Sequence, residues 1–364
     1  MQNSFNHIKI NNIKIHRHEI TVEEALYIYE QMPVSELMRL ADNLRQETVP
    51  GRGVSWQIDR NVNITNACIS GCLFCNFHCK PHDDKVYTTT IEEYCSKIDE
   101  LFTLGGNQLL LQGGLHPHYG LNFYTSLFRS LKQRYPRLKL HALGPPEVAH
   151  IARLEKMSYR DVLLQLREAG LDSLPGAGAE ILCDRVRTQL SPGKPDSQSW
   201  LDVMRQAHQL GFTTSATMVF GHIETKRERV EHLFKIRDLQ AEKPEGACGF
   251  LSFICWPILT RGTKLQELPP VSPVEYVKTV ALSRIILYNI PNIQASWLTV
   301  GRETAQLCLH AGANDLGSIM VEENVVSAAG AHCRMDAETM QQTIREAGYE
   351  PWLRDQKYQT MSYE

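Results

Sequence analysis

The segment Asn61-Val-Asn-Ile-Thr-Asn-Ala-Cys68-Ile-Ser-Gly-Cys72-Leu-Phe-Cys75 joins a short run of strand-forming residues to three closely spaced cysteines. The run predicts a β-strand, so the cysteines stand on the loop that follows it. A thiolate set of this density suits an iron–sulfur cluster or zinc. Gly71 lets the backbone bend so that all three sulfurs can face one centre. The C-x₃-C-x₂-C spacing departs from the paired cysteines of zinc ribbons, and three thiolates leave one iron of a 4Fe–4S cluster open.

Seven further strand-like runs follow the first one along the chain. They lie at residues 108–112, 139–143, 171–174, 213–220, 249–256, 293–298 and 313–318. Helical stretches alternate with them, and they have recognisable starts at residues 90–93, 158–161, 225–228 and 272–275. Alternating strands and helices predict a parallel sheet with right-handed crossovers, and eight units close a (β/α)₈ TIM-type barrel. A doubly wound open sheet is the alternative.

Three parts are expected along the chain. Residues 1–55 read as a helical N-terminal extension, with a capping box at residues 21–24 and a second helix near residues 35–45. Residues 56–335 form the barrel, and residues 336–364 form a C-terminal helix and tail packed on it. A barrel carries its active site at the C-terminal ends of its strands, so the residues that follow each run are the candidates for function.

Composition excludes several classes of protein. With 43% hydrophobic and 22% charged residues, the chain is ordinary globular material for one or two domains. A formal net charge of −3 gives no basic field for nucleic acid or an anionic membrane. We find neither a signal peptide nor an apolar stretch of about 18 residues that could span a bilayer. A cytoplasmic, reducing compartment is therefore expected, in which cysteines are ligands or buried fillers.

The cysteine pattern, with Phe74 just before its last cysteine, resembles that of the radical S-adenosylmethionine (SAM) superfamily. The resemblance implies that Cys68, Cys72 and Cys75 hold a 4Fe–4S cluster whose open iron binds SAM. An electron from the reduced cluster then cleaves the sulfonium and yields a 5′-deoxyadenosyl radical. It also implies a reducing partner such as flavodoxin or ferredoxin.

Further motifs narrow the resemblance. The motifs at residues 111–117 and 176–180 resemble those of the branch of the superfamily that contains the futalosine-pathway enzymes and the deazaflavin synthases. Residues 216–225, 253–257, 292–297 and 322–330 look most like the dehypoxanthine futalosine cyclases of menaquinone biosynthesis. That family resemblance implies abstraction of the ribose C4′ hydrogen of dehypoxanthine futalosine, and attack of the resulting radical on the benzoate ring. Aminofutalosine synthases and deazaflavin synthases are the alternatives within the branch.

Two readings from other classes stay open on the residues alone. Cys79 could supply a fourth thiolate and close the cluster, which would leave an electron carrier. A carrier needs no eight-strand barrel, so the length of the chain argues against it. A zinc-stabilised structural protein is the other reading, and the missing fourth cysteine at paired spacing argues against that.

Candidate residues for cofactor binding follow the second, third and fourth runs. The resemblance makes Gln112, Gly113 and Gly114 the segment that holds the amino group of SAM, and it places Phe74 beside the cofactor. Glu180 follows a glycine-rich turn, where a carboxylate could accept hydrogen bonds from ribose hydroxyls. Glu147, after Gly-Pro-Pro, is a candidate for the same reason; each carboxylate could instead be an ordinary helix start.

Candidate residues for chemistry and substrate binding follow the later runs. Histidine is the usual side chain for proton transfer at neutral pH, so His222 could accept the proton lost during rearomatisation, with Glu224 beside it. A benzoate carboxylate favours a bidentate cation, which Arg302 could supply, and Glu323 is a further substrate-binding candidate. Arg185 and Arg187 read as a solvated helix face.

Overall fold

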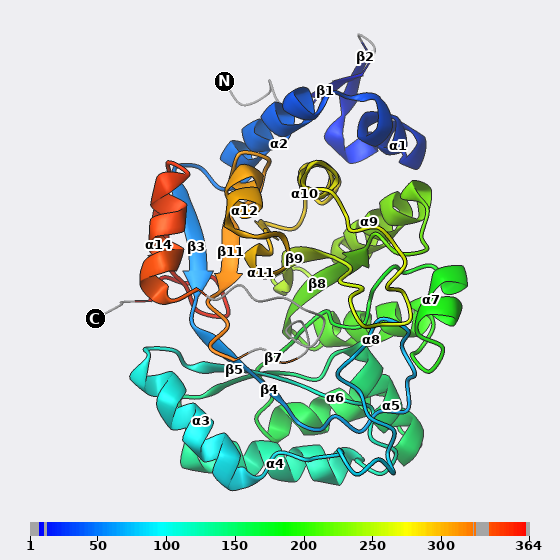
Figure 1. The fold of residues 1–364 in the computed structure, drawn as a ribbon, viewed down its shortest axis with the longest axis vertical. Helices are drawn as coiled ribbons and strands as arrows, with labels where there is room; N and C mark the ends of the chain where they lie inside the picture. Colours follow the sequence, from blue (N-terminus) through cyan, green and yellow to red (C-terminus); the bar gives the residue numbers. More distant parts are fainter. Residues whose placement is uncertain (1–6, 11–12, 323, 325–334, 362–364) are drawn as a thin grey trace.

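A computed structural model describes residues 7–10, 13–322, 324 and 335–361, with side chains from His18 onward. Its elements, labelled in Figure 1, are β1 (His7–Ile10), β2 (Ile13–His16), a 3₁₀ helix (Arg17–Glu19), α1 (Val22–Gln31), α2 (Val34–Thr48), β3 (Gly53–Gln57), β4 (Asp59–Asn63), α3 (Ile91–Thr103), β5 (Gln108–Gln112), α4 (Leu121–Arg134), β6 (Lys139–Ala142), α5 (Pro145–Glu155), α6 (Tyr159–Glu168), β7 (Ser173–Leu174), α7 (Asp184–Leu190), α8 (Ser197–Gln209), β8 (Thr213–Phe220), α9 (Lys226–Ala241), β9 (Gly249–Pro257), α10 (Pro273–Ile286), β10 (Asn292–Gln294), α11 (Trp297–Val300), α12 (Arg302–Leu309), β11 (Asp315–Ser318), α14 (Ala337–Glu346) and β12 (Glu350–Leu353).

The parallel sheet closes on itself through its first strand. Its order is β12-β3-β11-β10-β9-β8-β7-β6-β5-β4. Strands β3 and β4 are two parts of one extended run, separated by Ile58; β4 pairs with β5, and β3 pairs with β11. Beyond β11, Val321 N–H donates to Asp59 C=O at 3.2 Å and Asn61 N–H donates to Glu322 C=O at 3.2 Å. Those bonds join the two edges, so the predicted eight-stranded barrel is confirmed and the open sheet is not formed.

The predicted strands are found, and two of them keep the predicted bounds. β5 and β8 begin and end where the sequence placed them. The seventh run differs, because β10 ends at Gln294 and residues 297–300 form the short helix α11. The Ser296 N–H donates to the Tyr276 hydroxyl at 2.8 Å instead of to a neighbouring strand, which turns the chain out of the sheet.

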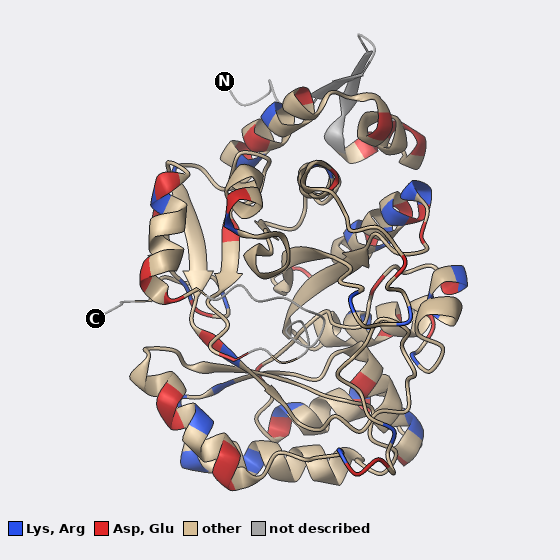
Figure 2. Ribbon diagram, viewed as in Figure 1, with Lys and Arg blue, Asp and Glu red and all other residues tan. Residues whose placement is uncertain are grey.

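Local sequence signals set the helix starts. Thr21, Thr90 and Thr225 each form a complete capping box, in which threonine and glutamate satisfy backbone donors reciprocally. Helix α10 begins at Pro273, with Ser272 accepting from Glu275 N–H. The helices surround the barrel (Figure 1), and Figure 2 shows charges of both signs intermixed on the outer faces of α3, α4 and α14. Within the part of the chain that the structure describes, no helix combines the length and apolarity needed to cross a membrane.

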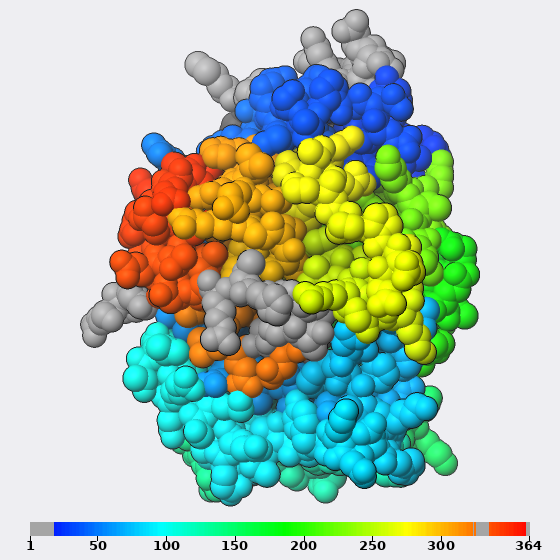
Figure 3. All heavy atoms as spheres, in the orientation of Figure 1, coloured from blue at the N-terminus to red at the C-terminus, as the bar shows by residue number. Residues whose placement is uncertain are grey.

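The N-terminal extension packs on the upper side of the barrel. Helices α1 and α2 contact α9 and α10, and Figure 3 shows the blue N-terminal segment against the yellow and orange one. Tyr29 of α1 donates to Glu275 at 2.7 Å and lies 2.8 Å from the Thr279 hydroxyl, which ties the extension to α10. The extension also holds an antiparallel hairpin, β1–β2, where the sequence predicted a helical extension without strands.

The C-terminal segment adds a strand that the sequence did not predict. After α14, β12 pairs in parallel with β3 outside the barrel. Pro351 weakens the strand signal of this segment, yet proline is tolerated because β12 is an edge strand. The turn that follows carries Arg354 and Gln356 into the lining of the barrel interior. The division into parts at residues 55 and 335 stays a prediction.

Candidate active site

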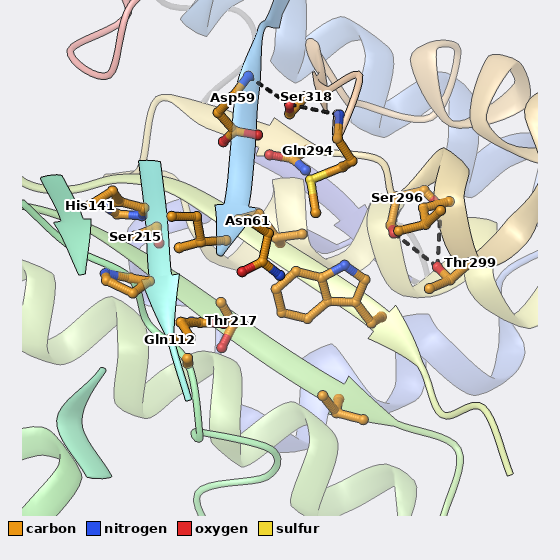
Figure 4. A pocket seen from close by; sticks show the side chains of 18 of the residues that line it. Asp59, Asn61, Gln112, His141, Ser215, Thr217, Gln294, Ser296, Thr299 and Ser318 are labelled. Atoms are coloured by element: carbon orange, nitrogen blue, oxygen red, sulfur yellow. Dashed lines mark hydrogen bonds between the residues drawn. The ribbon is translucent and has the colours of Figure 1, made fainter. Parts of the chain in front are cut away.

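The barrel encloses a cavity of about 380 Å³ that reaches from the cysteine loop to the C-terminal turn. Its lining comes from every barrel strand or the loop after it, and Figure 4 shows ten of the polar side chains. Near the loops it includes Phe74, Cys75, Glu180, Lys194, Trp256 and Trp297; deeper it includes Gln57, Asp59, Gln108, His141, Gln294 and Arg354. The cavity is large enough for a small organic substrate and polar along much of its wall.

The cysteine loop spans the mouth of the cavity beside β4. Cys72 is buried, whereas Cys68 and Cys75 are partly exposed. The sulfur of Cys68 lies 3.3 Å from Leu115 N and 3.4 Å from Ser70 N, and both N–H groups donate to it. Backbone donors of this kind stabilise the thiolate that a metal requires. The donor set therefore fits a metal centre with cysteine ligands.

Gly114 holds the loop close to the second strand. A methyl group added at this position would lie 2.2 Å from Ala67 O and 2.8 Å from the Cβ of Cys68. Gly193 has the same role on the other side, because a methyl group there would lie 2.5 Å from Ser70 Cα. Only glycine permits these approaches, so both residues position the cysteines.

The contacts of its sulfur distinguish Cys79 from the three predicted ligands. Among the described residues, no group of three His, Cys, Asp or Glu side chains is placed to hold a single metal ion. Cys79 is engaged otherwise: its sulfur accepts from Asn66 Nδ2 at 3.2 Å, and its backbone bonds to Asn66 and Cys68.

A buried ion pair lies next to the loop. Lys194 Nζ bonds to Glu180, and it also lies 5.6 Å from the centre of the Phe74 ring. Burial raises the pKa of Glu180, but the charges of Lys194 and Arg187 outweigh it, so the net direction is downward. Glu180 is therefore an anion that lines the cavity. Its backbone has a φ of +42°, a left-handed conformation.

Glu147 lies behind this pair at the first turn of α5. Burial raises the pKa of Glu147 to about 7. Hydrogen bonds from its own backbone and from Gly113, together with the charge of Lys194, lower the pKa but do not outweigh burial. The carboxyl does not line the cavity but contacts the Gly113 backbone. Its protonation state therefore changes near neutral pH beside the loop that carries Gly113 and Gly114.

The structure brings some of the predicted residues together. Phe74, Cys75, Gln112 and Glu180 line the cavity, while Gly113 and Gly114 pack between it and the cysteine loop. Their roles stay predictions. Glu323 lies outside the described residues.

His222 and Glu224 lie away from the cavity lining. Both ring nitrogens of His222 are engaged, Nε2 with Val219 O at 2.9 Å and Nδ1 with Ile223 N at 2.8 Å. Glu224 accepts from Gly221 N and pairs with Arg229 at 2.7 Å. This placement gives no support to a direct role in proton transfer; it makes the two residues the frame of the turn after β8.

Two arginines are placed differently from the sequence interpretation. Arg302 lies at the start of α12 and pairs with Glu346, away from the cavity lining, and its substrate-binding role stays a prediction. Arg187, interpreted as part of a solvated face, is 3% exposed. The Arg187 side chain points inward from α7, toward the loops that carry Glu180 and Lys194. Its guanidinium donates to the carbonyl oxygens of Gly178, Ala179 and Pro195.

Apart from Gln112, sequence reasoning missed the polar residues inside the barrel. Gln57, Asp59 and Asn61 alternate along the first strand, as do Gln108 and Gln112 along β5. Alternate residues of a strand face the same side, so this period of two was the available signal. Lys194 had no signal, because it lies on a loop between two helices and enters the site only through the packing of α7.

Comparison with known proteins matches two family profiles. The radical SAM superfamily profile matches residues 62–236, and the CofH/MqnC C-terminal region matches residues 247–364. The chain is 40% identical to the cyclic dehypoxanthine futalosine synthase of Streptomyces coelicolor, covering 93% of this chain and 85% of the relative. It is 39% identical to the Halalkalibacterium halodurans protein of the same name, covering 93% and 91%.

Other relatives and solved structures extend the comparison. A 5-amino-6-(D-ribitylamino)uracil–L-tyrosine 4-hydroxyphenyl transferase of Methanosarcina acetivorans is 38% identical, covering 85% of this chain and 82% of the relative. Methylornithine synthase (PylB) superposes with a TM-score of 0.68 at 20% identity, covering 91% and 94% of the two chains. The hydrogenase maturase HydG from Carboxydothermus hydrogenoformans gives 0.72 at 13% identity, covering 93% and 77%. The solved structures support the barrel fold.

Proposed function

Because this chain belongs to the radical SAM superfamily, whose members use a 4Fe–4S cluster and SAM, we propose that it cyclises dehypoxanthine futalosine in menaquinone biosynthesis. The observation that carries the proposal is the similarity to two synthases of that name over 93% of the chain. The matched family profiles cover residues 62–236 and 247–364, which include the cysteine loop and most of the cavity lining. The enclosed, partly polar cavity suits a small substrate with a sugar and an aromatic ring.

In this proposal Cys68, Cys72 and Cys75 hold the cluster. When bound, the cluster and SAM supply a 5′-deoxyadenosyl radical. The chain's own residues place the substrate beneath the cysteine loop and keep water away from it. Gly114 and Gly193 fix the loop, and Trp256 and Trp297 contribute apolar wall next to the mouth of the cavity. A reducing partner such as flavodoxin or ferredoxin supplies the electron.

Glu180 and Lys194 contribute a charged pair at the mouth of the cavity. Glu180 has two carboxylate oxygens, of which Oε1 faces Lys194. The other oxygen is suited to accept from sugar hydroxyls of a molecule bound near the loop. Lys194 keeps Glu180 ionised in this buried place, which maintains its capacity to accept hydrogen bonds.

The test is an anaerobic assay of the reconstituted protein. Dithionite and SAM are added with and without dehypoxanthine futalosine, and 5′-deoxyadenosine and product are followed by mass spectrometry. Formation of 5′-deoxyadenosine that rises with substrate, together with a product lacking a pair of hydrogen atoms, supports the cyclase. SAM cleavage without that product would mean that the chain acts on the substrate of another enzyme of the same branch.

A second candidate rests on the hydroxyphenyl transferases, whose identity of 38% is close to that of the synthases. Their name describes a 4-hydroxyphenyl transfer that involves L-tyrosine and 5-amino-6-(D-ribitylamino)uracil. The same assay with tyrosine and 5-amino-6-(D-ribitylamino)uracil separates the two candidates, because each pair of substrates gives a product of different mass.

A further inference from the structure

The middle of the cavity carries neutral polar side chains that are not used by the protein itself. Gln112 at the end of β5 and Gln294 at the end of β10 both line the cavity (Figure 4). Neither side chain has a hydrogen-bond partner among the described residues, and the same holds for the hydroxyl of Thr213, a residue that is 6% exposed. A protein normally satisfies its buried polar groups, so groups left over in a cavity indicate a ligand or water.

His141 belongs to the same set. Its Nδ1 bonds to the Ser173 hydroxyl on the neighbouring strand, while Nε2 has no partner among the described residues. Burial lowers its pKa to about 3, so the imidazole is neutral at the pH of a cell. The ring therefore offers one hydrogen bond to a neutral group and no positive charge to an anion.

Gln294 depends on a glycine for its position. A methyl group on Gly317 of β11 would lie 2.2 Å from Gln294 Nε2. Gly317 has φ of +71°, a conformation that other residues rarely adopt. The Gln294 amide thus lies across β11 because that position lacks a side chain, which fixes the amide within the lumen.

The charges around the cavity disfavour an anion in this middle region. The two lining cations among the described residues are both paired, Lys194 with Glu180 and Arg354 with Asp315. Asp59 also lines the cavity and carries a carboxyl. An amide, by contrast, both donates and accepts, which suits neighbouring hydroxyl groups on one molecule.

From these observations we propose that Gln112, His141 and Gln294 bind the hydroxyl groups of the sugar portion of the substrate. The inference rests on the proposed function for the identity of that substrate. The sugar lies inside the barrel, and the benzoate carboxylate lies away from these three side chains. Gln112 precedes Gly113 and Gly114, which pack against the cysteine loop, so a sugar held here lies directly below the loop.

The test is a thermodynamic cycle between protein and substrate. Equilibrium binding is measured by calorimetry on the reconstituted holoenzyme with SAM and without reductant, so that no turnover occurs. Dehypoxanthine futalosine is compared with analogues that lack one ribose hydroxyl, on the natural protein and on Gln294→Leu. The natural protein should lose about tenfold in affinity for at least one analogue, the size expected when a buried polar group is left unpaired. Gln294→Leu should lose about twofold or less for that same analogue.

Two controls make the cycle specific. Gln198→Leu makes the same chemical change on the exposed face of α8 and should behave as the natural protein does. An analogue with a carboxamide in place of the benzoate carboxylate should change affinity equally in the natural protein and in Gln294→Leu. Equal losses for the deoxy analogues in both proteins, or a carboxamide effect that depends on Gln294, would overturn the inference.

Folding and substrate identity are controlled separately. If Gln294→Leu melts at a lower temperature than the natural protein, Gln294→Met replaces it in the cycle, because methionine keeps the unbranched shape of the side chain without the amide. If the natural holoenzyme does not bind dehypoxanthine futalosine, the proposed function fails, and the cycle is run with 5-amino-6-(D-ribitylamino)uracil and its deoxy analogues. If the loss caused by removing a ribityl hydroxyl is smaller in the variant than in the natural protein, the sugar-binding role of these side chains is retained. If the loss is the same in both proteins, that role is rejected.

Discussion

The guanidinium of Arg354 clamps the carboxylate of Asp315, with Nε 2.6 Å from Oδ2 and Nη2 3.2 Å from Oδ1. Arg354 comes from the turn after β12, and Asp315 begins β11. Both are buried, at 6% and 0% exposed, and Arg354 also donates to Gln57. This pair fastens the C-terminal segment to the base of the barrel and closes the cavity on that side.

Arg354→Met should therefore destabilise the protein. It leaves the Asp315 charge buried without its partner, which costs on the order of 3–5 kcal/mol in unfolding free energy. Urea unfolding followed by circular dichroism measures the change. Lys357→Met alters an exposed cation in the same turn and should change the unfolding free energy by less than about 0.5 kcal/mol. A wild-type midpoint for Arg354→Met would show that the clamp contributes little.

Gly114→Ala should prevent correct placement of the cysteine loop. Its methyl group would meet backbone at 2.2 Å, and backbone cannot move aside as a flexible side chain can. We expect less than about a tenth of the natural iron content after reconstitution, with the barrel still folded. Gly53→Ala is the control, because the φ of Gly53 is not positive and a methyl group there would meet only side-chain atoms of Trp352, at 3.2 Å. Equal iron content in the two variants would contradict the role given to Gly114.

Cys79 and Cys72 should respond differently to replacement. Cys72→Ala removes a proposed ligand and should abolish both iron loading and 5′-deoxyadenosine formation. Cys79→Ala removes a sulfur that is already bonded to Asn66, so iron content and SAM cleavage should stay within about twofold of natural values. Loss of the cluster in Cys79→Ala would instead favour a four-cysteine electron carrier.

Glu147 should make stability fall as pH rises. Its pKa is about 7 in the folded protein against an ordinary 4.5, so the folded state holds a proton that the unfolded state has lost between these values. The contribution of Glu147 to stability is fully present below about pH 4.5 and is lost as pH rises toward 7. At roughly 1.4 kcal/mol per pKa unit, the decline in unfolding free energy amounts to up to about 3 kcal/mol. Glu147→Gln removes this decline because glutamine does not titrate.

Thermal unfolding at pH 5 and pH 8 tests the role of Glu147. The advantage of Glu147→Gln over the natural protein should grow between the two values. Glu338→Gln, an exposed change on α14, should give the same difference at both. A pH-independent difference for Glu147→Gln would mean that the carboxyl is ionised throughout.

Glu224 should matter for stability more than for chemistry. Burial raises its pKa, but His222 and Arg229 outweigh this and bring it to about 2. The stabilisation is therefore present above pH 4.5 and is lost as pH falls toward 2. At neutral pH, Glu224→Ala should cost on the order of 3 kcal/mol because Arg229 loses a buried partner.

Activity per folded molecule separates the two roles of this turn. Glu224→Ala and His222→Ala should keep 5′-deoxyadenosine and product coupled as in the natural protein. If His222→Ala melted normally but released 5′-deoxyadenosine without product, the proton-transfer role predicted from the sequence would be supported after all.

Sequence alone was sufficient for features that depend on local chemistry. The capping box at Thr21, the strand at residues 108–112 and the loop with Cys68, Cys72 and Cys75 follow from side-chain type and spacing, which act over a few residues. Only the tertiary structure placed His222, Glu224 and Arg302 away from the cavity lining and Lys194, His141 and Gln294 inside it. The reason is physical: the direction of a side chain depends on strand pleat, barrel closure and helix packing, which bring together residues distant in the chain.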